Sequence, residues 1–91
     1  VSCLCPMGVN TAMLNSGADS DSAAARQGAK AVTQAGLVLE ALEVADIVVE
    51  SLGTDEFLIL PHPDVLEFYR RKGSDYDRWL RGMRRYQDSL A

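Results

Sequence analysis

Phe57-Leu58-Ile59-Leu60 is the longest unbroken apolar run of this sequence, and it decides the fold class. Asp55 and Glu56 precede the run and Pro61 follows it, which gives it the length and the boundaries of one strand. Its side chains are apolar on both alternations, a pattern typical of a strand that is covered on both faces in a parallel sheet. A run this short is far from the length that a membrane span needs.

A second strand and a helix are predicted before this run. Residues 1–5 have the pattern of a strand that stops at Pro6, because proline has no N–H to donate to a sheet. Apolar residues recur at intervals of three and four across residues 41–52, which predicts a helix that ends at Gly53. A strand, a crossover containing a helix and a second strand most simply form a right-handed parallel βαβ unit. Two strands do not make a stable sheet alone, so the pattern predicts further neighbours.

The crossover begins with a small, polar stretch. Residues 15–22 have little to bury and predict a mobile loop. Either Asp21 or Ser22 is suited to cap a helix that follows it, although Gly28 and Gly36 weaken that helix. Because the helix is rich in alanine, we expect it to become ordered only against another part of the protein.

Two helices are expected at the end of the sequence, over residues 63–70 and residues 75–89. Pro63 is suited to a first helical turn. The second helix has one apolar stripe, which we interpret as core packing rather than as a ligand site. The members of the stripe are Tyr76, Trp79, Leu80, Met83, Tyr86 and Leu90.

Charge is divided unevenly along the chain, whose formal net charge is −4. Residues 1–69 hold two basic and ten acidic side chains, whereas residues 70–91 hold seven basic and three acidic ones. A basic helix can bind phosphates, but we favour a solvated helix face beside an acidic body, and we expect no nucleic-acid partner. The asymmetry keeps one alternative open, a non-catalytic protein-interaction or oligomerisation module whose basic helix, residues 78–85, docks an acidic partner.

Few side chains are suited to catalysis or to metal binding. Cys3 and Cys5 point the same way in a strand, where a disulfide between them would be strained, so we expect two buried thiols in a reducing compartment. A zinc site needs further ligands, and the single histidine, His62, stands between two prolines and is interpreted as a turn residue. Tyr69 and Lys72 can meet on a helix, but the lysine follows two arginines and is expected to be solvated. We predict no catalytic residue and no metal site.

The most informative motif is Cys5-Pro6-Met7-Gly8-Val9-Asn10-Thr11-Ala12-Met13-Leu14. It resembles the stretch of short-chain dehydrogenases/reductases in which the sixth strand ends, which typically reads Pro-Gly-x-Val-x-Thr-x-Met. The matching positions are Pro6, Val9, Thr11 and Met13. The motif departs from the family at one place, where Met7 replaces the usual glycine and Gly8 follows one position later.

The resemblance continues to the end of the chain. Residues 43–52 look like the family's last crossover helix, residues 57–61 like its seventh strand, and residues 75–80 like the tail of one branch. The resemblance implies an α/β fold, the C-terminal part of a Rossmann-type doubly wound parallel sheet. This part holds the last two strands, the crossover helix and two C-terminal helices. Residues 1–91 then form one partial domain, in which residues 12–37 are the substrate lid and residues 63–91 the helical tail.

An activity follows from the same resemblance. The family transfers hydride between a nicotinamide cofactor, NAD or NADP, and an alcohol or carbonyl substrate. In the family, backbone groups around the position of Val9 bind the nicotinamide carboxamide, and the threonine at the position of Thr11 supplies a hydroxyl nearby. The residues implied for the cofactor are Pro6, Gly8, Val9 and Thr11, and those implied for the substrate are Met13 and Leu14.

The family's Gly-rich nucleotide loop and its catalytic Ser, Tyr and Lys match no residues here. We therefore expect a fragment that begins after them, binds no dinucleotide by itself and is inactive alone. The resemblance also implies a homo-oligomer joined through residues 41–52 and 57–60. We expect this protein in the cytoplasm, without a membrane partner.

Overall fold

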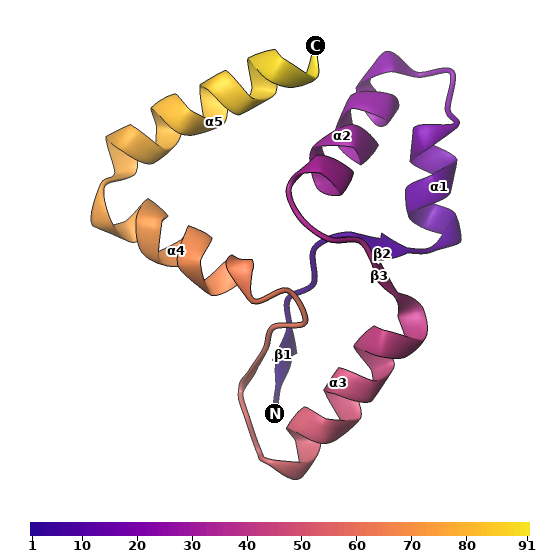
Figure 1. Ribbon diagram of the computed structural model, residues 1–91, viewed down its shortest axis with the longest axis vertical. Coiled ribbons are helices and arrows are strands. Elements are labelled where there is room, and N and C mark those ends of the chain that lie inside the picture. The colour runs from indigo at the N-terminus through magenta and orange to yellow at the C-terminus, as the bar shows by residue number, and fades with distance from the viewer.

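The protein is described by a computed structural model of residues 1–91, which has a mixed α/β fold with five helices and four short strands (Figure 1). In chain order the elements are β1 (Cys3–Leu4), β2 (Val9–Asn10), α1 (Ala12–Ala18), α2 (Ala23–Gln34), β3 (Leu39–Glu40), α3 (Ala41–Gly53), β4 (Leu58–Ile59), α4 (Asp64–Ser74) and α5 (Tyr76–Leu90). None of the helices combines the length and the apolar character that crossing a membrane requires.

The strands form two separate parallel pairs. β1 pairs with β4, with Cys3 opposite Leu58 and Leu4 opposite Ile59. This parallel pair, with a helix-containing crossover between its strands, confirms the predicted connection. The second pair, β2 with β3, was not expected from the sequence, because each of its strands is only two residues long.

The apolar run 57–60 is only partly covered within this chain, and the sheet that it joins has two strands, so the further neighbours that the sequence pattern predicts are not among these residues. Ile59 is 2% exposed, whereas Leu58 is 48% and Phe57 is 62% exposed. The two-stranded pair has one helix, α3, in contact with β4, and nothing in the chain covers the opposite face. Phe57 and Leu58 point to opposite sides of the strand and are both exposed, so the burial is concentrated at Ile59.

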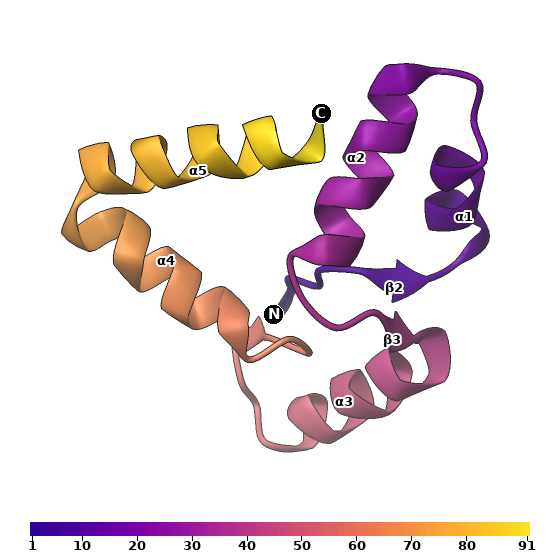
Figure 2. The same ribbon diagram turned by 45° about the horizontal axis from the view of Figure 1, so that its top comes forward.

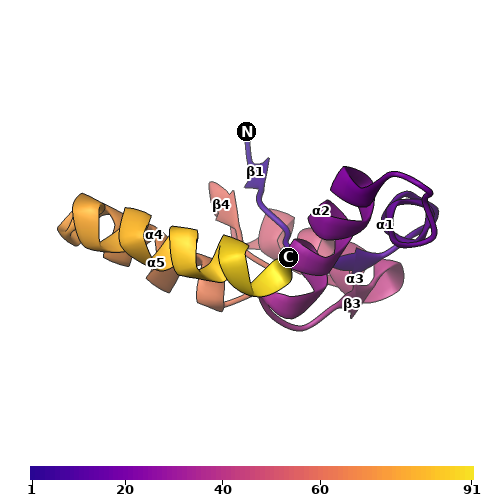
Figure 3. The same cartoon turned by 90° about the horizontal axis from the view of Figure 1, so that it is seen from above.

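The molecule is thin and expanded. Its radius of gyration is 15.0 Å and its extents are 42 × 35 × 19 Å, whereas a compact domain of this length has a radius of gyration of about 12 Å. Figures 1 and 2 show α4 and α5 as an arm on one side and α1 and α2 on the other, with β2 and β3 below α1 and α2. Seen from above, these elements form a shallow layer (Figure 3).

The C-terminal end of α5 packs against α2. The Tyr86 hydroxyl donates a hydrogen bond to the carbonyl oxygen of Ala31 in α2 at 2.6 Å, and Leu90 is buried. These two residues belong to the predicted apolar stripe of α5. Tyr76, Leu80 and Met83 of the same stripe remain exposed, so core packing is correct for only part of it.

The prediction of a loop over residues 15–22 is wrong for its first half, because α1 extends to Ala18. The Thr11 hydroxyl oxygen caps this helix by accepting the N–H of Leu14 at 3.4 Å. Ser22, one of the two predicted caps, begins α2 by accepting the N–H of Ala25 at 3.3 Å. The region expected to form a lid is therefore a pair of helices that pack against each other.

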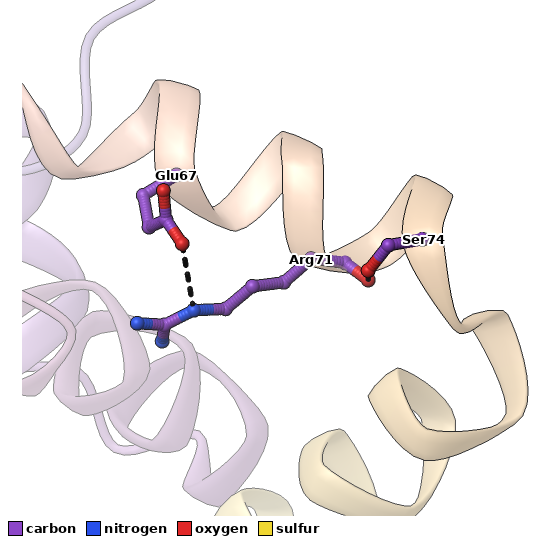
Figure 4. A network of polar contacts seen from close by, with 3 residues as sticks. All are labelled: Glu67, Arg71 and Ser74. Atoms are coloured by element: carbon purple, nitrogen blue, oxygen red, sulfur yellow. Dashed lines mark hydrogen bonds and ion pairs between the residues drawn. The ribbon is translucent and has the colours of Figure 1, made fainter.

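The other three helices are close to their predicted bounds. α3 begins with a capping box between Glu40 and Glu43, in which each side chain pairs with the backbone N–H of the other residue. α5 is capped by Asp75, whose carboxylate accepts the N–H of Arg78 at 3.1 Å. In α4, the Nε of Arg71 lies 3.2 Å from a carboxylate oxygen of Glu67 one turn earlier (Figure 4). This exposed pair contributes only tenths of a kcal/mol, about 0.3–0.5 for such helix pairs.

Candidate functional site

A hollow lies between α1, α2 and the end of β2, and we call it the α1–α2 hollow. Its volume is about 370 Å³ and most of its lining is apolar. The residues that line it are Met7, Val9, Thr11, Met13, Leu14, Gly17, Ala25, Gly28, Ala29 and Val32. Val9, Thr11, Met13 and Leu14 are four of the six residues predicted for the cofactor and the substrate.

Small residues on one face of α2 leave room for the hollow. Ala25, Gly28, Ala29 and Val32 recur at intervals of three and four residues and so lie on one side of the helix. A Cβ atom built on Gly28 has no neighbour within 4 Å, so the glycine borders open space. The spacing of these small residues is visible in the sequence and could have identified the wall of the hollow. We interpreted the helix instead as one that packs weakly, because it is rich in alanine and poor in large apolar side chains.

Val9 turns its backbone polar groups away from its partner strand. The carbonyl oxygen of Gly8 accepts the N–H of Leu39 at 3.0 Å, so Gly8 faces β3. Successive residues of an extended strand face opposite sides, and the N–H and C=O of Val9 therefore point to the edge that has no partner strand. That edge offers one donor and one acceptor side by side.

The Thr11 side chain stands next to this edge. Its oxygen accepts the α1 cap hydrogen bond, but a hydroxyl also carries one proton that it can donate. Neighbouring polar contacts fix the strand end: the Asn10 amide donates to both carboxylate oxygens of Glu40, at 3.1 and 3.3 Å. Asn10 and Glu40 are opposite each other in the β2–β3 pair, so their contact ties the two strands together.

Pro6 and Gly8 do not line the hollow, although both were predicted to bind the cofactor. Pro6 is exposed and lies between β1 and β2. Gly8 is buried, and a Cβ atom on it would lie 3.2 Å from Cγ1 of Val32 and 3.3 Å from Cγ2 of Val38. Gly8 therefore allows close packing behind the site, and it does not itself present a group to the hollow.

His62 is the residue whose role the sequence interpretation missed. It is 4% exposed, and its ring hydrogen-bonds with the backbone of three other residues. His62 does lie in the bend between β4 and α4, where its carbonyl oxygen accepts the N–H of Val65 at 3.1 Å, but the prediction of a turn residue did not include the contacts of its buried ring. A histidine directly after the strand, held between Pro61 and Pro63, was the available signal, but its partners lie 25 to 55 residues away along the chain.

The two cysteines are free, but they are not buried as expected. Cys3 is exposed and Cys5 is half-buried, with their Sγ atoms 3.7 Å apart. The hydrogen bond with Cys3 raises the pKa of the Cys5 thiol, and desolvation and the charge of Cys3 act in the same direction. Cys5 consequently has less thiolate at neutral pH than an ordinary cysteine. No group of three or more potential ligands is close enough to hold a metal ion.

Lys72 is not solvated in the way that its sequence context predicted. Its Nζ lies 4.5 Å from the centroid of the Trp79 ring and 5.5 Å from that of Tyr76. The ammonium group therefore interacts with aromatic faces at the junction of α4 and α5. Tyr69 is 75% exposed, and its side chain makes no hydrogen bond with Lys72.

Comparisons of the chain with protein-family models, with curated proteins and with solved structures find no match.

Proposed function

We propose that this chain is the C-terminal part of an NAD(P)-dependent short-chain dehydrogenase/reductase, with the last strands of a Rossmann-type sheet. In this proposal the protein transfers hydride between the nicotinamide ring and an alcohol or carbonyl substrate. The observation that carries the proposal is the position of Val9, Thr11, Met13 and Leu14, which resemble the family's motif and surround one hollow.

The polar groups at this hollow suit a nicotinamide carboxamide. A primary amide has a carbonyl acceptor and an N–H donor in one plane. The open edge at Val9 has the complementary pair, a backbone N–H and a backbone C=O, and the Thr11 hydroxyl is a further donor beside it. Two fixed hydrogen bonds to a planar group would set which face of the attached ring meets the substrate. When bound, the cofactor would supply the hydride itself.

The apolar lining beyond this edge suits a small substrate. Met13 is 86% exposed at the mouth of the hollow, and Leu14 is half-buried inside it. Both residues lie on α1, which is short and has no buried residue of its own. A short helix whose residues all stay at least partly exposed can open and close over a bound molecule, as a lid requires.

The proposal assigns only part of the chemistry to these residues. The adenosine half of the cofactor and the proton transfer would depend on the family's nucleotide loop and its Ser, Tyr and Lys, none of which these residues supply. The chain alone is therefore proposed to be inactive. Its two free thiols suit a reducing compartment such as the cytoplasm.

Val9→Pro tests the backbone donor directly. Proline removes the N–H that points to the open edge and leaves the β2–β3 hydrogen bonds intact, since those use the neighbouring residues. We expect affinity for NADH or NADPH, measured by fluorescence titration of the longest form of the protein, to fall about three- to tenfold. One lost hydrogen bond of about 0.5–1.5 kcal/mol has this effect.

Val9→Ala is the matched control, because it keeps the N–H and shortens the same side chain. Its affinity should stay within about twofold of the parent protein, less than the effect of a single lost hydrogen bond. Equal losses for both variants would contradict the backbone role. Absence of nicotinamide cofactor binding to the parent protein would overturn the proposed function.

We also propose that a second copy of this chain covers the outer face of α3. Leu42, Val49 and Leu52 lie on one side of this helix and are 79%, 71% and 59% exposed. Phe57 and Leu58, beside and in β4, are exposed as well, and in the family that the motif resembles, the last strand and its preceding helix commonly meet their symmetry mates. Val49→Glu should shift the protein to monomers in sedimentation velocity, whereas the neighbouring Glu50→Gln should leave the assembly unchanged. A parent protein that sediments as a monomer would contradict this part of the proposal.

A second candidate is a protein-interaction module. Arg78, Arg81 and Arg85 are exposed, are spaced by three and four residues along α5, and make no ion pair within the chain. Such a row fits an acidic partner. This module would bind no nicotinamide cofactor, so the titration described for Val9 distinguishes the two functions.

A further inference from the structure

His62 lies where the two strand pairs meet. It follows β4, the end of one pair, and its ring contacts the residues just before β2 and β3, the beginning of the other. Gly8, Ile59, Pro61 and His62 are all buried, and they make up half of the eight buried residues of the chain. A polar ring therefore occupies one of the few water-excluded places in the molecule.

The hydrogen bonds of the His62 ring indicate which of its two nitrogen atoms carries the proton. The backbone N–H of Met7 donates to Nδ1 at 3.0 Å, so Nδ1 is an acceptor and carries no proton. A neutral imidazole then has its proton on Nε2. Nε2 lies 2.9 Å from the carbonyl oxygen of Leu37 and 3.1 Å from that of Gly8, and it donates to both. Every polar atom of the buried side chain has a partner.

Both ring nitrogens of His62 hydrogen-bond with the segment between β1 and β2, which we call the Met7–Gly8 turn. The ring accepts from the N–H of Met7 and donates to the carbonyl of Gly8, while the same carbonyl also accepts the N–H of Leu39 at 3.0 Å. A carbonyl oxygen has two lone pairs, and both are used here. The peptide that joins Gly8 to Val9 is thereby fixed in orientation, and with it the direction in which Val9 presents its N–H.

We propose that His62 is a positioning residue: as a neutral imidazole protonated on Nε2, it fixes the Met7–Gly8 turn so that Val9 faces the α1–α2 hollow with its backbone donor and acceptor. The inference rests on the proposed function where it assigns the Val9 edge to the nicotinamide carboxamide. Pro61 and Pro63 support the role, because two restricted φ angles beside His62 limit where the ring can lie.

Three variants of His62 distinguish the contribution of the acceptor Nδ1 from that of the donor Nε2. The amide of His62→Asn can accept at the position of Nδ1, the amide of His62→Gln can donate at the position of Nε2, and His62→Phe keeps a ring but does neither. We expect His62→Phe to weaken NADH binding to the longest form of the protein on the order of tenfold, or about 1.4 kcal/mol. The two amide variants should each recover part of this loss.

Leu90→Ala is the control for a merely structural effect. Leu90 is also buried, at 8% exposed, but it lies at the end of α5 and does not line the hollow. This variant should lower the melting temperature and leave the NADH affinity unchanged. An equal loss of affinity in Leu90→Ala and His62→Phe would show that stability alone governs binding, and it would overturn the positioning role.

Heteronuclear NMR of the chain tests the inference without a cofactor. The imidazole of the parent protein should give the signals of a neutral ring protonated on Nε2, and His62→Phe should shift the amide resonances of Gly8 and Val9. A ring protonated on Nδ1, or unchanged amide resonances in the variant, would overturn the inference whether or not NADH binds. Failure of the parent protein to bind NADH, with both NMR results as expected, would overturn the proposed function alone.

Discussion

Replacing Ile59 with alanine is expected to lower the free energy of unfolding by about 2–4 kcal/mol, because it removes a buried branched side chain and leaves a cavity. Ile59 is the most deeply buried apolar residue of the protein, at 2% exposed. It lies opposite Leu4 in the β1–β4 pair and two residues before the buried Pro61, which His62 follows. Urea unfolding followed by circular dichroism measures the loss.

Leu58→Ala is the matched control from the same strand. Leu58 is 48% exposed and points to the opposite face. Its replacement should cost less than about 1 kcal/mol, since little apolar area leaves the interior. Similar losses for Leu58 and Ile59 would mean that both faces of β4 are covered, for example by the second copy proposed for α3.

Gly8→Val is the second substitution with a large expected effect. A Cβ atom at this position already lies within 3.3 Å of the side chains of Val32 and Val38, so the added methyl groups have no room. Overpacking of this kind costs about 1–3 kcal/mol, measured again by urea unfolding. Because α2 would be pushed away from the turn, Val32→Ala in the same chain should recover part of the loss.

Gly28→Ala should have the opposite sign. Gly28 lies inside α2 with nothing within 4 Å of its Cβ position. Alanine there is expected to stabilise the protein by about 0.5–1 kcal/mol through its higher helix propensity. Destabilisation by Gly28→Ala would contradict the open space found at that position.

Much of the fold could be predicted from local pattern. The apolar recurrence in residues 41–52, with Gly53 after it, marked α3 almost to the residue, and Asp75 marked the start of α5. Parallel pairing of β1 with β4 followed from the length of the connection between them. These features depend on residues close together in sequence or on general rules of chain connection.

The errors come from contacts that leave no periodic pattern in the sequence. α1 has no apolar period and is stabilised by the Thr11 cap and by packing on α2, so its sequence resembles a loop. The β2–β3 pair is too short to show alternation. The incomplete coverage of β4 was expected in one respect, because the apolar run predicts neighbours beyond a pair of strands, but which side chains of the run stay exposed depends on the packing around them.

Four of the six residues singled out in the sequence line the α1–α2 hollow, and their role there stays a proposal. Val9, Thr11, Met13 and Leu14 were identified through a motif whose residues are nearly adjacent in sequence. His62 was missed because a lone histidine in a Pro-rich turn looks the same whether its ring is solvated or buried. Only the arrangement in space brings its ring to the Met7–Gly8 turn.

The three-way contact of His62 also bears on the order in which this protein acquires its shape. Met7 and His62 are separated by 55 positions, and Leu37 and His62 by 25, so this contact forms only once long loops have closed, which no single helix requires. A growing chain on the ribosome would form α1, α2 and α3 well before the imidazole emerges. The turn that orients Val9 would thus be among the last parts to settle, and a translation product ending before Pro61 would have its helices but no ordered turn.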